Sequence, residues 1–367
     1  MSAARRRSTP PRRRPIPRRP NILFLANWPS TTRDPEHYAF FAHWESRPRV
    51  RFFGTQALGA WSRWERDVFK FYLVQPLLAL FLAPFYDAVV AFSSQSGLPF
   101  ALLLRLCFWM RVKLIVFDVE SFGRVRGGWP LRLARFAASR IDRVVYASSG
   151  QEAYYDRWFP QGKERRVFIP LGVGDYEKRR PDDAGREGPI VALGKHGAAF
   201  RDWACLLHAY ADHAAQAELW IVGRRDLPPE ERAGAAIPPS VRFVPYLPMD
   251  ELRDVIEQAR FVVLPLPERE QSLGQLSALL TMALGKAVIA SGVIGLRDYV
   301  RDGETGLCYP AGDARALSAC LGKLLAAPDL VAAYGRAARQ RQQAEFNDRL
   351  MAQRWEELFR AVTGGAR

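Results

Sequence analysis

The chain has 367 residues, which is more than one compact hydrophobic core usually holds and fits two domains of ordinary size. Hydrophobic residues make up 49% and charged residues 25%, a composition that excludes a fibrous or wholly disordered chain. The formal net charge is +15, but eight arginines and no acid lie in the first 20 residues, so the remainder carries a mild excess of about +7.

The segment 1–20 is rich in Arg and Pro, has almost nothing apolar to bury, and is predicted to be a disordered tail. It is either a solvated tail without a specific role or a segment attracted to anionic lipid, where each basic residue contributes on the order of 1 kcal/mol. Nucleic-acid binding is not expected, because no aromatic residue is interleaved for base stacking. The tail also lacks the apolar stretch of a secretory signal.

From residue 21 onward, apolar runs alternate with amphipathic segments. The predicted strands of the first half are 21–26, 49–53, 87–92, 113–117, 143–147 and 166–169, with a turn at 93–97 and helices at 99–110 and 129–139. Strands that alternate with helices form a parallel sheet with helices on both faces. We therefore predict an N-terminal Rossmann-like domain over residues 21–173.

Residues 71–86 form an uncharged apolar segment that is shorter than the ~20 residues a spanning helix needs, and Pro76 and Pro84 interrupt it. One interpretation is a core helix followed by a loop. The other is a surface segment that dips into the bilayer beside a lipid acceptor, a setting in which Trp61 and Trp64 would suit the interface.

The charged stretch 174–188 interrupts the pattern and is predicted to be an interdomain linker. Beyond it, the predicted strands are 189–193, 218–222, 241–243, 261–265 and 287–290, and the predicted helices are 202–213, 249–258, 276–283 and those that fill the chain from about 314. This predicts a second Rossmann-like domain over 189–345. Ligands of open parallel sheets bind outside the carboxyl ends of the strands, so two facing sheets predict a site in the cleft between the lobes.

A glycine-rich basic turn follows the first strand of the second domain. It contains Gly194, Lys195 and Gly197, and Arg201 comes six residues after the lysine. Two cations near a helix start are a plausible cradle for a diphosphate, because helix amides and charge-assisted contacts both favour anions. Solvated loop cations are the alternative interpretation. Further along, Gly274 precedes a helix and can offer backbone amides to a phosphate, with Ser272 and Gln275 beside it.

The order of these segments resembles the donor-site signature of glycosyltransferase family 4. The matching parts are MALGKAVIAS at 282–291, Gly295, and RDGETGLCYPAGD at 301–313. Upstream, residues 191–195 look like the family's phosphate-binding turn, and residues 201–203 look like the segment with its second basic residue. Residues 217–223 look like the family's next strand, and residues 241–252 look like the loop that frames the nucleotide base. Residues 166–173 look like the end of its first domain. The likeness covers most of residues 165–315.

The resemblance implies a GT-B fold, in which two Rossmann-like, doubly wound parallel-sheet domains face a central cleft, and a terminal helix over 346–367 that crosses back to the first domain. It implies retaining transfer from a nucleoside-diphosphate sugar, with UDP or GDP as the leaving group. Lys195 and Arg201 would neutralise the departing diphosphate. The implied donor-binding residues are Gly194, Gly197, Gly223, Arg224, Pro245, Tyr246, Glu270, Gln271, Ser272, Gly274 and Gln275. No metal and no cofactor are expected, because the cations take the metal's role and no DxD motif lies in a suitable loop.

The chain departs from the family at its acidic positions. The family usually has two glutamates eight residues apart, which fall here at Ser272 and Leu280, or at Gln271 and Leu279, depending on the point from which they are counted. Glu268, Glu270 and Gln275 are neighbours that can substitute in part. These departures indicate a divergent branch or a different sugar.

The acceptor is expected on the first domain, at the end of the strand 113–117. Asp118 or Glu120 would bind an acceptor hydroxyl or act as a base, near Asn27 and Ser121. A helix cap or a surface carboxylate is the alternative interpretation. The family often has a histidine before this aspartate, whereas this chain has Phe117. His37 is a further candidate, although a lone histidine is usually structural.

The leading hypothesis is a transferase that builds a cell-surface polysaccharide or a glycolipid, in the cytoplasm or peripheral on the inner face of the plasma membrane. The predicted membrane contacts are residues 71–86 and the Arg-rich tail. The alternatives are a catalytically silent GT-B-like scaffold, a sugar-nucleotide epimerase or phosphorylase on the same fold, and a nucleic-acid binder. The cysteines form no CxxC pair and no recognised zinc pattern, which predicts free thiols in a reducing compartment; they are Cys107, Cys205, Cys308 and Cys320.

Overall fold

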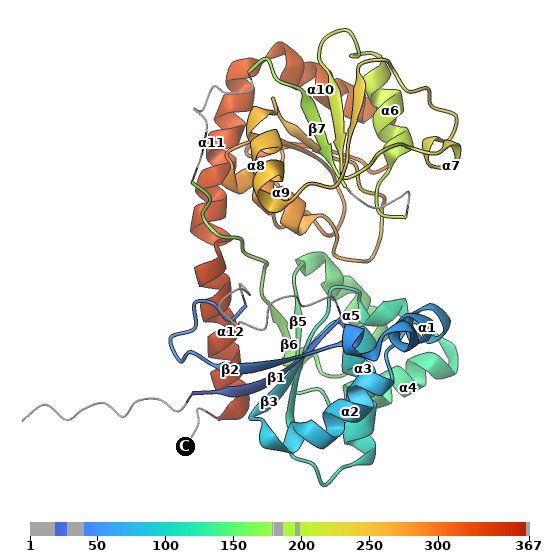
Figure 1. Cartoon of the computed structure of the whole chain (residues 1–367), viewed down its shortest axis with the longest axis vertical. Coiled ribbons are helices and arrows are strands. Elements are labelled where there is room, and N and C mark those ends of the chain that lie inside the picture. Colours follow the sequence, from blue (N-terminus) through green and yellow to red (C-terminus); the bar gives the residue numbers. More distant parts are fainter. Residues whose placement is uncertain (1–18, 28–39, 178, 180–185, 195–198, 365–367) are drawn as a thin grey trace, which may run out of the picture.

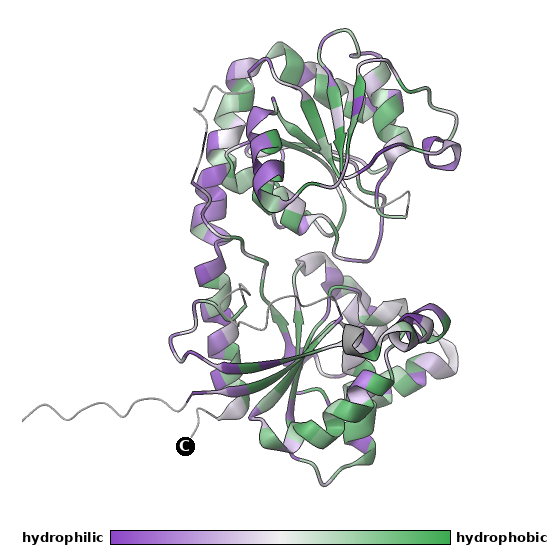
Figure 2. Ribbon diagram, in the orientation of Figure 1, coloured by the Kyte–Doolittle hydropathy of each residue, from purple (hydrophilic) through white to green (hydrophobic). Residues whose placement is uncertain are grey.

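The computed structural model describes residues 19–27, 40–177, 179, 186–194 and 199–364. The chain forms two lobes, and each lobe contains a six-stranded parallel sheet with helices on both faces (Figure 1). The predicted fold class is therefore confirmed. Apolar strands occupy the centre of both lobes, as Figure 2 shows, because strands buried on both faces must be apolar throughout.

The N-terminal sheet has the strand order β2-β1-β3-β4-β5-β6, and every pair in it is parallel. Its strands are β1 (Asn21–Ala26), β2 (Arg49–Gly54), β3 (Ala88–Phe92), β4 (Lys113–Phe117), β5 (Arg143–Tyr146) and β6 (Arg166–Phe168). The helices are α1 (Ala60–Phe69), α2 (Val74–Leu82), α3 (Ser94–Leu106), α4 (Gly128–Ala138) and α5 (Glu152–Trp158). The order of strands reverses between β1 and β3, which is where a doubly wound sheet opens a crevice for ligands.

The predicted turn at 93–97 is wrong, because α3 begins at Ser94 with the Ser93 hydroxyl capping the amide of Gln95 at 3.1 Å. Pro99 lies inside this helix and cannot donate to the carbonyl of Gln95. The amide of Tyr72 donates to that carbonyl instead, at 3.0 Å. A contact from a distant segment thus lets the helix run through a proline that reads as a helix start in the sequence.

The C-terminal sheet has the strand order β12-β11-β10-β7-β8-β9 and is again parallel. Its strands are β7 (Ile190–Leu193), β8 (Leu219–Val222), β9 (Val241–Val244), β10 (Val262–Leu264), β11 (Val288–Ser291) and β12 (Gly306–Tyr309). The helices are α6 (Trp203–Ala211), α7 (Pro229–Arg232), α8 (Met249–Gln258), α9 (Gln275–Ala283), α10 (Ala314–Ala326), α11 (Pro328–Glu345) and α12 (Asp348–Thr363). Strand β12 was not predicted, since its four residues sit among turn residues. The strand order reverses between β7 and β10.

The last helix, α12, leaves the C-terminal lobe and packs on the N-terminal sheet (Figure 1). Its buried side chains include Met351, Trp355 and Phe359, which join the core formed with β1, β3, β4 and β5. The carboxylate of Glu356 fixes the loop before β2, because its two oxygens accept from the amides of Glu45 at 2.9 Å and Ser46 at 3.0 Å.

The apolar segment 71–86 forms α2 and the short 3-10 helix Ala83–Phe85. Gln75, Pro76 and Ala79 of α2 are buried, whereas Phe81 is 71% exposed, so the segment is a surface helix with one buried face. Within the described residues, no single helix is long and apolar enough to cross a membrane. The four cysteines are free thiols, of which Cys205 is buried and the others are half-buried.

Candidate functional site

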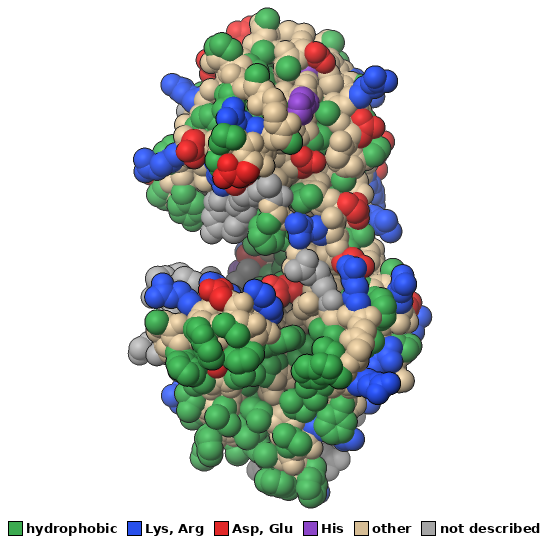
Figure 3. Space-filling view, turned by 90° about the vertical axis from the view of Figure 1, so that its right-hand side faces the viewer, with side chains coloured by type: hydrophobic (Ala, Val, Ile, Leu, Met, Phe, Trp, Pro, Cys, Tyr) green, Lys and Arg blue, Asp and Glu red, His purple; other side chains and the backbone are tan. Residues whose placement is uncertain are grey.

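The carboxyl ends of the two sheets meet between the lobes, and loops from both domains touch there. The amide of Ser272 donates to the carbonyl of Val119 at 3.1 Å, and the hydroxyl of Ser121 donates to the carbonyl of Glu270 at 2.8 Å. The space-filling view shows the molecule hollowed between its lobes (Figure 3). In each sheet the strand order reverses between two central strands, and ligands of such sheets bind outside the carboxyl ends of the strands at that point. The hollow is therefore where the fold places a ligand.

Arg201 lies at the reversal point of the C-terminal sheet. Its Nε donates to the carbonyl of Leu193 at 2.7 Å and its Nη1 to the carbonyl of Phe200 at 2.7 Å. The residue is only 6% exposed, and no carboxylate among the described residues pairs with it. Burial lowers the pKa of Arg201 to about 10, so it stays cationic at neutral pH. A buried cation without an acidic partner favours an anionic ligand.

Gly194 is the position over which the Arg201 side chain passes. A Cβ atom there would lie 2.4 Å from Arg201 Nε and 2.8 Å from its Cγ, so any larger residue would displace the arginine. The amide of Gly194 donates to the carbonyl of Val222 at 3.0 Å, which fixes the end of β7. Lys195 and Gly197 lie outside the described residues, as does His37.

The loop after β10 brings a second cation to the same end of the sheet. The carbonyl of Pro265 accepts from the amide of Asp202 at 2.8 Å, which joins this loop to the Arg201 segment. The guanidinium of Arg269 lies 5.9 Å from the ring centre of Phe200, and its buried Nε has no hydrogen-bond partner. Sequence reasoning missed Arg269, because an arginine between two glutamates reads as a solvated charge cluster.

Gly274 caps helix α9 with φ of 86°, a left-handed conformation that favours glycine. A Cβ atom there would also lie 2.5 Å from Leu266 Cδ1. The first bond of the helix runs from Ala278 N to the carbonyl of Gly274, so the amides of 275–277 have no acceptor within the helix. The side-chain amide of Gln275 donates from Nε2 to the Ser272 hydroxyl, so these two predicted donor-binding side chains contact each other.

Of the two acidic side chains of the loop, Glu268 is exposed and Glu270 is engaged across the domains. Glu270 pairs with Arg126 of the N-terminal domain at 2.8 Å, while Gln271 beside it is half-buried. Leu279 and Leu280, at the alternative positions of the second family glutamate, are buried apolar side chains. The sequence of α9, QLSALLTMA, contains no acidic residue, so this helix supplies no carboxylate to the hollow.

The remaining predicted donor contacts lie at the ends of β8 and β9. Gly223 has φ of 100°, and its amide and that of Arg224 both donate to the carbonyl of Val244, at 2.8 and 3.1 Å. The Arg224 guanidinium pairs with Glu231 at 2.9 Å, so it serves its own loop. Pro245 and Tyr246 are exposed just after β9, and Tyr246 is 70% exposed.

Asp118 is fully buried, and its carboxylate organises the loop after β4. Oδ1 accepts from the amide of Glu120 at 3.1 Å, and Oδ2 accepts from the amide of Phe122 at 2.6 Å and the hydroxyl of Tyr155 at 2.6 Å. Burial raises the pKa of Asp118, while these three donors act in the opposite direction. In this structure Asp118 positions the loop through these contacts, and its role in binding or deprotonating the acceptor stays a prediction. Glu120, on the same loop, is half-buried.

A further group of cross-domain contacts is not predicted by the sequence. The carboxylate of Asp298 accepts from the hydroxyls of Ser148 at 3.1 Å and Ser149 at 2.6 Å, and from the amide of Ser149 at 2.8 Å. Next to it, the hydroxyl of Tyr299 donates to the carbonyl of Ala147 at 2.6 Å. These contacts join the end of β5 to the segment after β11 and fix one side of the hollow.

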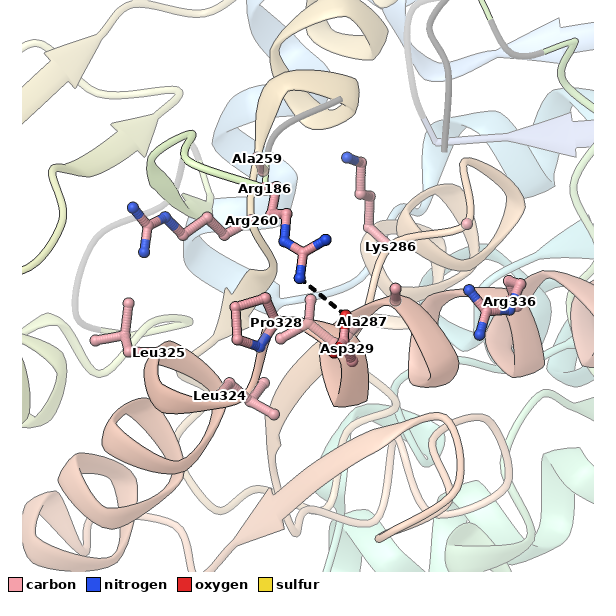
Figure 4. A pocket seen from close by; sticks show the side chains of 13 residues that line it. Arg186, Ala259, Arg260, Lys286, Ala287, Leu324, Leu325, Pro328, Asp329 and Arg336 are labelled. Carbon is pink, nitrogen blue, oxygen red and sulfur yellow. Dashed lines mark hydrogen bonds and ion pairs between the residues drawn. The ribbon is translucent and has the colours of Figure 1, made fainter. Parts of the chain in front are cut away.

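A pocket of about 270 Å³ lies elsewhere on the C-terminal domain (Figure 4). Its lining includes Arg260 and Lys286, which precede β10 and β11, so the pocket is at the amino ends of the strands, opposite to the hollow. Arg186 reaches across it to Asp329 at 2.9 Å. The pocket is therefore separate from the candidate site.

Part of the chain is similar in sequence to known proteins. Residues 189–327 match the family model described as glycosyl transferases group 1. The chain is 35% identical over 123 residues to alpha-maltose-1-phosphate synthase of Mycolicibacterium smegmatis, covering 32% of this chain and 31% of that protein. It is 39% identical over 98 residues to D-inositol 3-phosphate glycosyltransferase of Streptomyces scabiei, covering 27% and 21%. The matched part thus spans less than a third of these relatives.

Solved structures match almost the whole chain. Sucrose-phosphate synthase of Thermosynechococcus elongatus has a TM-score of 0.70 at 21% identity, over 95% of this chain and 100% of that one. HepE of Anabaena in complex with UDP-glucose has a TM-score of 0.70 at 16% identity, over 94% and 100%. The predicted resemblance to GT-B glycosyltransferases is confirmed, and the assignment to family 4 stays a prediction.

Proposed function

We propose that the chain is a glycosyltransferase that moves a sugar from a nucleoside-diphosphate sugar to a saccharide or lipid-linked acceptor. The observation that carries the proposal is Arg201, a buried cation that faces no acid among the described residues and lies at the reversal point of the nucleotide-binding type of sheet. The match of residues 189–327 to group 1 glycosyl transferases supports it, as does the UDP-glucose complex of the similar HepE structure.

The donor would lie along the carboxyl edge of the C-terminal sheet. Its diphosphate would contact Arg201, Lys195, Arg269 and the amides of 275–277. Its base would lie near Pro245 and Tyr246, beyond β9. Preorganised donors aimed at developing charge are worth about 2.7–4 kcal/mol each in well-studied enzymes, and here that charge develops on the departing diphosphate as the glycosidic C–O bond breaks.

The acceptor would enter from the N-terminal domain, where the loop after β4 touches the donor loop. Glu120 is the remaining carboxylate of that loop, since the oxygens of Asp118 are engaged within the loop. We further propose retention at the anomeric carbon, no metal requirement, a cytoplasmic location, and a place in the synthesis of a polysaccharide or glycolipid.

A catalytically silent scaffold is the second candidate function, because leucines occupy the second family glutamate's position on α9. Measurements of nucleotide binding and of donor turnover distinguish the transferase from the scaffold. We expect one nucleoside diphosphate of a panel of UDP, GDP and ADP to raise the thermal stability of the purified chain, since ligands that bind only the native state stabilise it.

The matching nucleosides serve as controls in this experiment, because they carry the base without the diphosphate and should cause a much smaller shift. If none of the diphosphates changes the stability of a well-folded sample, the proposed donor site is wrong. If the nucleosides shift the melting temperature as much as the diphosphates do, the assignment of Arg201 to the diphosphate is wrong.

A further inference from the structure

The outer side of the N-terminal domain is an unusually apolar surface. Of the 19 large apolar side chains exposed in the described residues, 15 lie between residues 61 and 136, on or beside helices α1 to α4; we call this surface the α1–α4 face. Phe81, Phe85, Phe108, Trp109 and Trp129 are each at least 67% exposed. Figure 3 shows hydrophobic side chains gathered broadly over this domain. Large contiguous patches of exposed apolar side chains mark interaction sites.

The helices of this face are fixed to one another. The buried carboxylate of Glu65, on α1, accepts from the amides of Leu73 at 3.2 Å and Val74 at 3.1 Å, which start α2. The guanidinium of Arg105, on α3, lies 5.0 Å from the ring centre of Phe136, on α4. The apolar side chains are therefore presented by a folded surface.

The charges on this face are nearly all positive. On the four helices and the turn 107–112, the exposed acid is Asp67, and Arg66 pairs with it at 3.0 Å. Six exposed basic side chains lie on or beside the same helices; they are Arg63, Arg66, Lys70, Arg105, Arg111 and Arg132. The one other acid of α1, Glu65, points inward and caps α2.

These features select a bilayer surface as the occupant. Trp and Phe side chains mixed with Lys and Arg are typical of segments that lie in the interface of a membrane with anionic lipid. The segments Ala60–Phe69 and Val74–Phe85 are bent by 115° from each other, so they do not form one straight helix. A symmetric contact with a second copy would place these like charges opposite each other.

We infer that the α1–α4 face docks the chain on an anionic bilayer. In Figure 3 the face lies directly below the hollow between the lobes, on the side toward which the hollow opens. A bilayer on this face would therefore bring lipid headgroups to the mouth of the site. This part of the inference rests on the proposed function: the acceptor is carried by a lipid, and the sugar is added to its headgroup.

The test is cosedimentation of the full chain with vesicles of phosphatidylcholine, with and without phosphatidylglycerol. We expect binding to the anionic vesicles and a loss of at least about tenfold in affinity for Phe81→Ser/Phe85→Ser/Trp129→Ser. Phe168→Ser is the matched control, because Phe168 is exposed on strand β6, outside the face. To separate the contribution of the tail from that of the face, the arginines of residues 1–20 are replaced by serine. We expect vesicle binding of this variant to depend on the same aromatic residues.

Nucleotide binding, measured on the same samples, keeps this proposal apart from the proposed function. Loss of vesicle binding with unchanged nucleotide affinity supports the docking surface. Undiminished vesicle binding of the triple variant, or no vesicle binding by the intact chain, overturns it and leaves the donor site standing. A dimer that the triple variant abolishes, without vesicle binding, would show that the face contacts a second copy instead.

Discussion

Arg201→Ala is expected to weaken binding of the preferred nucleoside diphosphate by roughly 10- to 100-fold, because a hydrogen bond to a charged group is worth about 1.5–3 kcal/mol. Isothermal titration of the intact chain and the variant measures this change. Since burial lowers the pKa of Arg201 to about 10, we also expect the affinity of the intact chain to fall as the pH rises through that value.

Gly194→Ala provides an independent route to the same result. Its Cβ would meet Arg201 Nε at 2.4 Å, so the variant displaces the guanidinium without removing it. Arg315→Ala is the control, because Arg315 is an exposed arginine of α10 in the same domain. If both site variants fold and bind the diphosphate as tightly as the intact chain does, Arg201 does not contact the donor.

Asp118→Ala is expected to lower the free energy of unfolding of the N-terminal domain by at least about 3 kcal/mol. The variant leaves three donors without their acceptor, namely the amides of Glu120 and Phe122 and the hydroxyl of Tyr155, and each buried unsatisfied donor costs about 1–3 kcal/mol. Urea denaturation followed by tryptophan fluorescence measures the loss.

Two further variants define the role of Asp118. Tyr155→Phe removes one of the three donors, and the double variant should lose less than the sum of the single losses because the two side chains share a hydrogen bond. Asp67→Ala should change stability little, since Asp67 is an exposed carboxylate paired with Arg66. A stable but inactive Asp118→Ala variant would contradict a positioning role and restore Asp118 as a group that acts on the acceptor.

Much of the fold could be predicted from the sequence, because buried parallel strands are short apolar runs separated by amphipathic helices. Strand 21–26 and helix 249–258 match the structure at both ends. Errors arose where distant contacts override local signals. Helix α3 runs through Pro99 because Tyr72 satisfies the carbonyl of Gln95, and no local pattern reveals that bond.

The site could be predicted in its backbone features but not in the partners of its side chains. Gly194 is predicted from its place after a strand and Gly274 from its place before a helix, and the structure adds the close contacts that require glycine there. The contacts of the Asp118 carboxylate depend on Tyr155, 37 residues away, and the orientation of Arg269 toward Phe200 depends on how two loops meet. Such pairings depend on tertiary packing, which spacing along the chain does not encode.

Transfer of labelled sugar from UDP-, GDP- and ADP-sugars to a lipid or polysaccharide extract distinguishes glycosyl transfer from its alternatives. The intact chain is assayed, with Arg201→Ala as the control. We predict that one donor yields a labelled product together with its free nucleoside diphosphate, and that the variant yields much less. If the diphosphate binds but no donor is consumed with any acceptor, the chain is a silent scaffold. If the sugar is altered while it stays joined to its nucleotide, the chain is an epimerase, and the proposed glycosyl transfer is wrong.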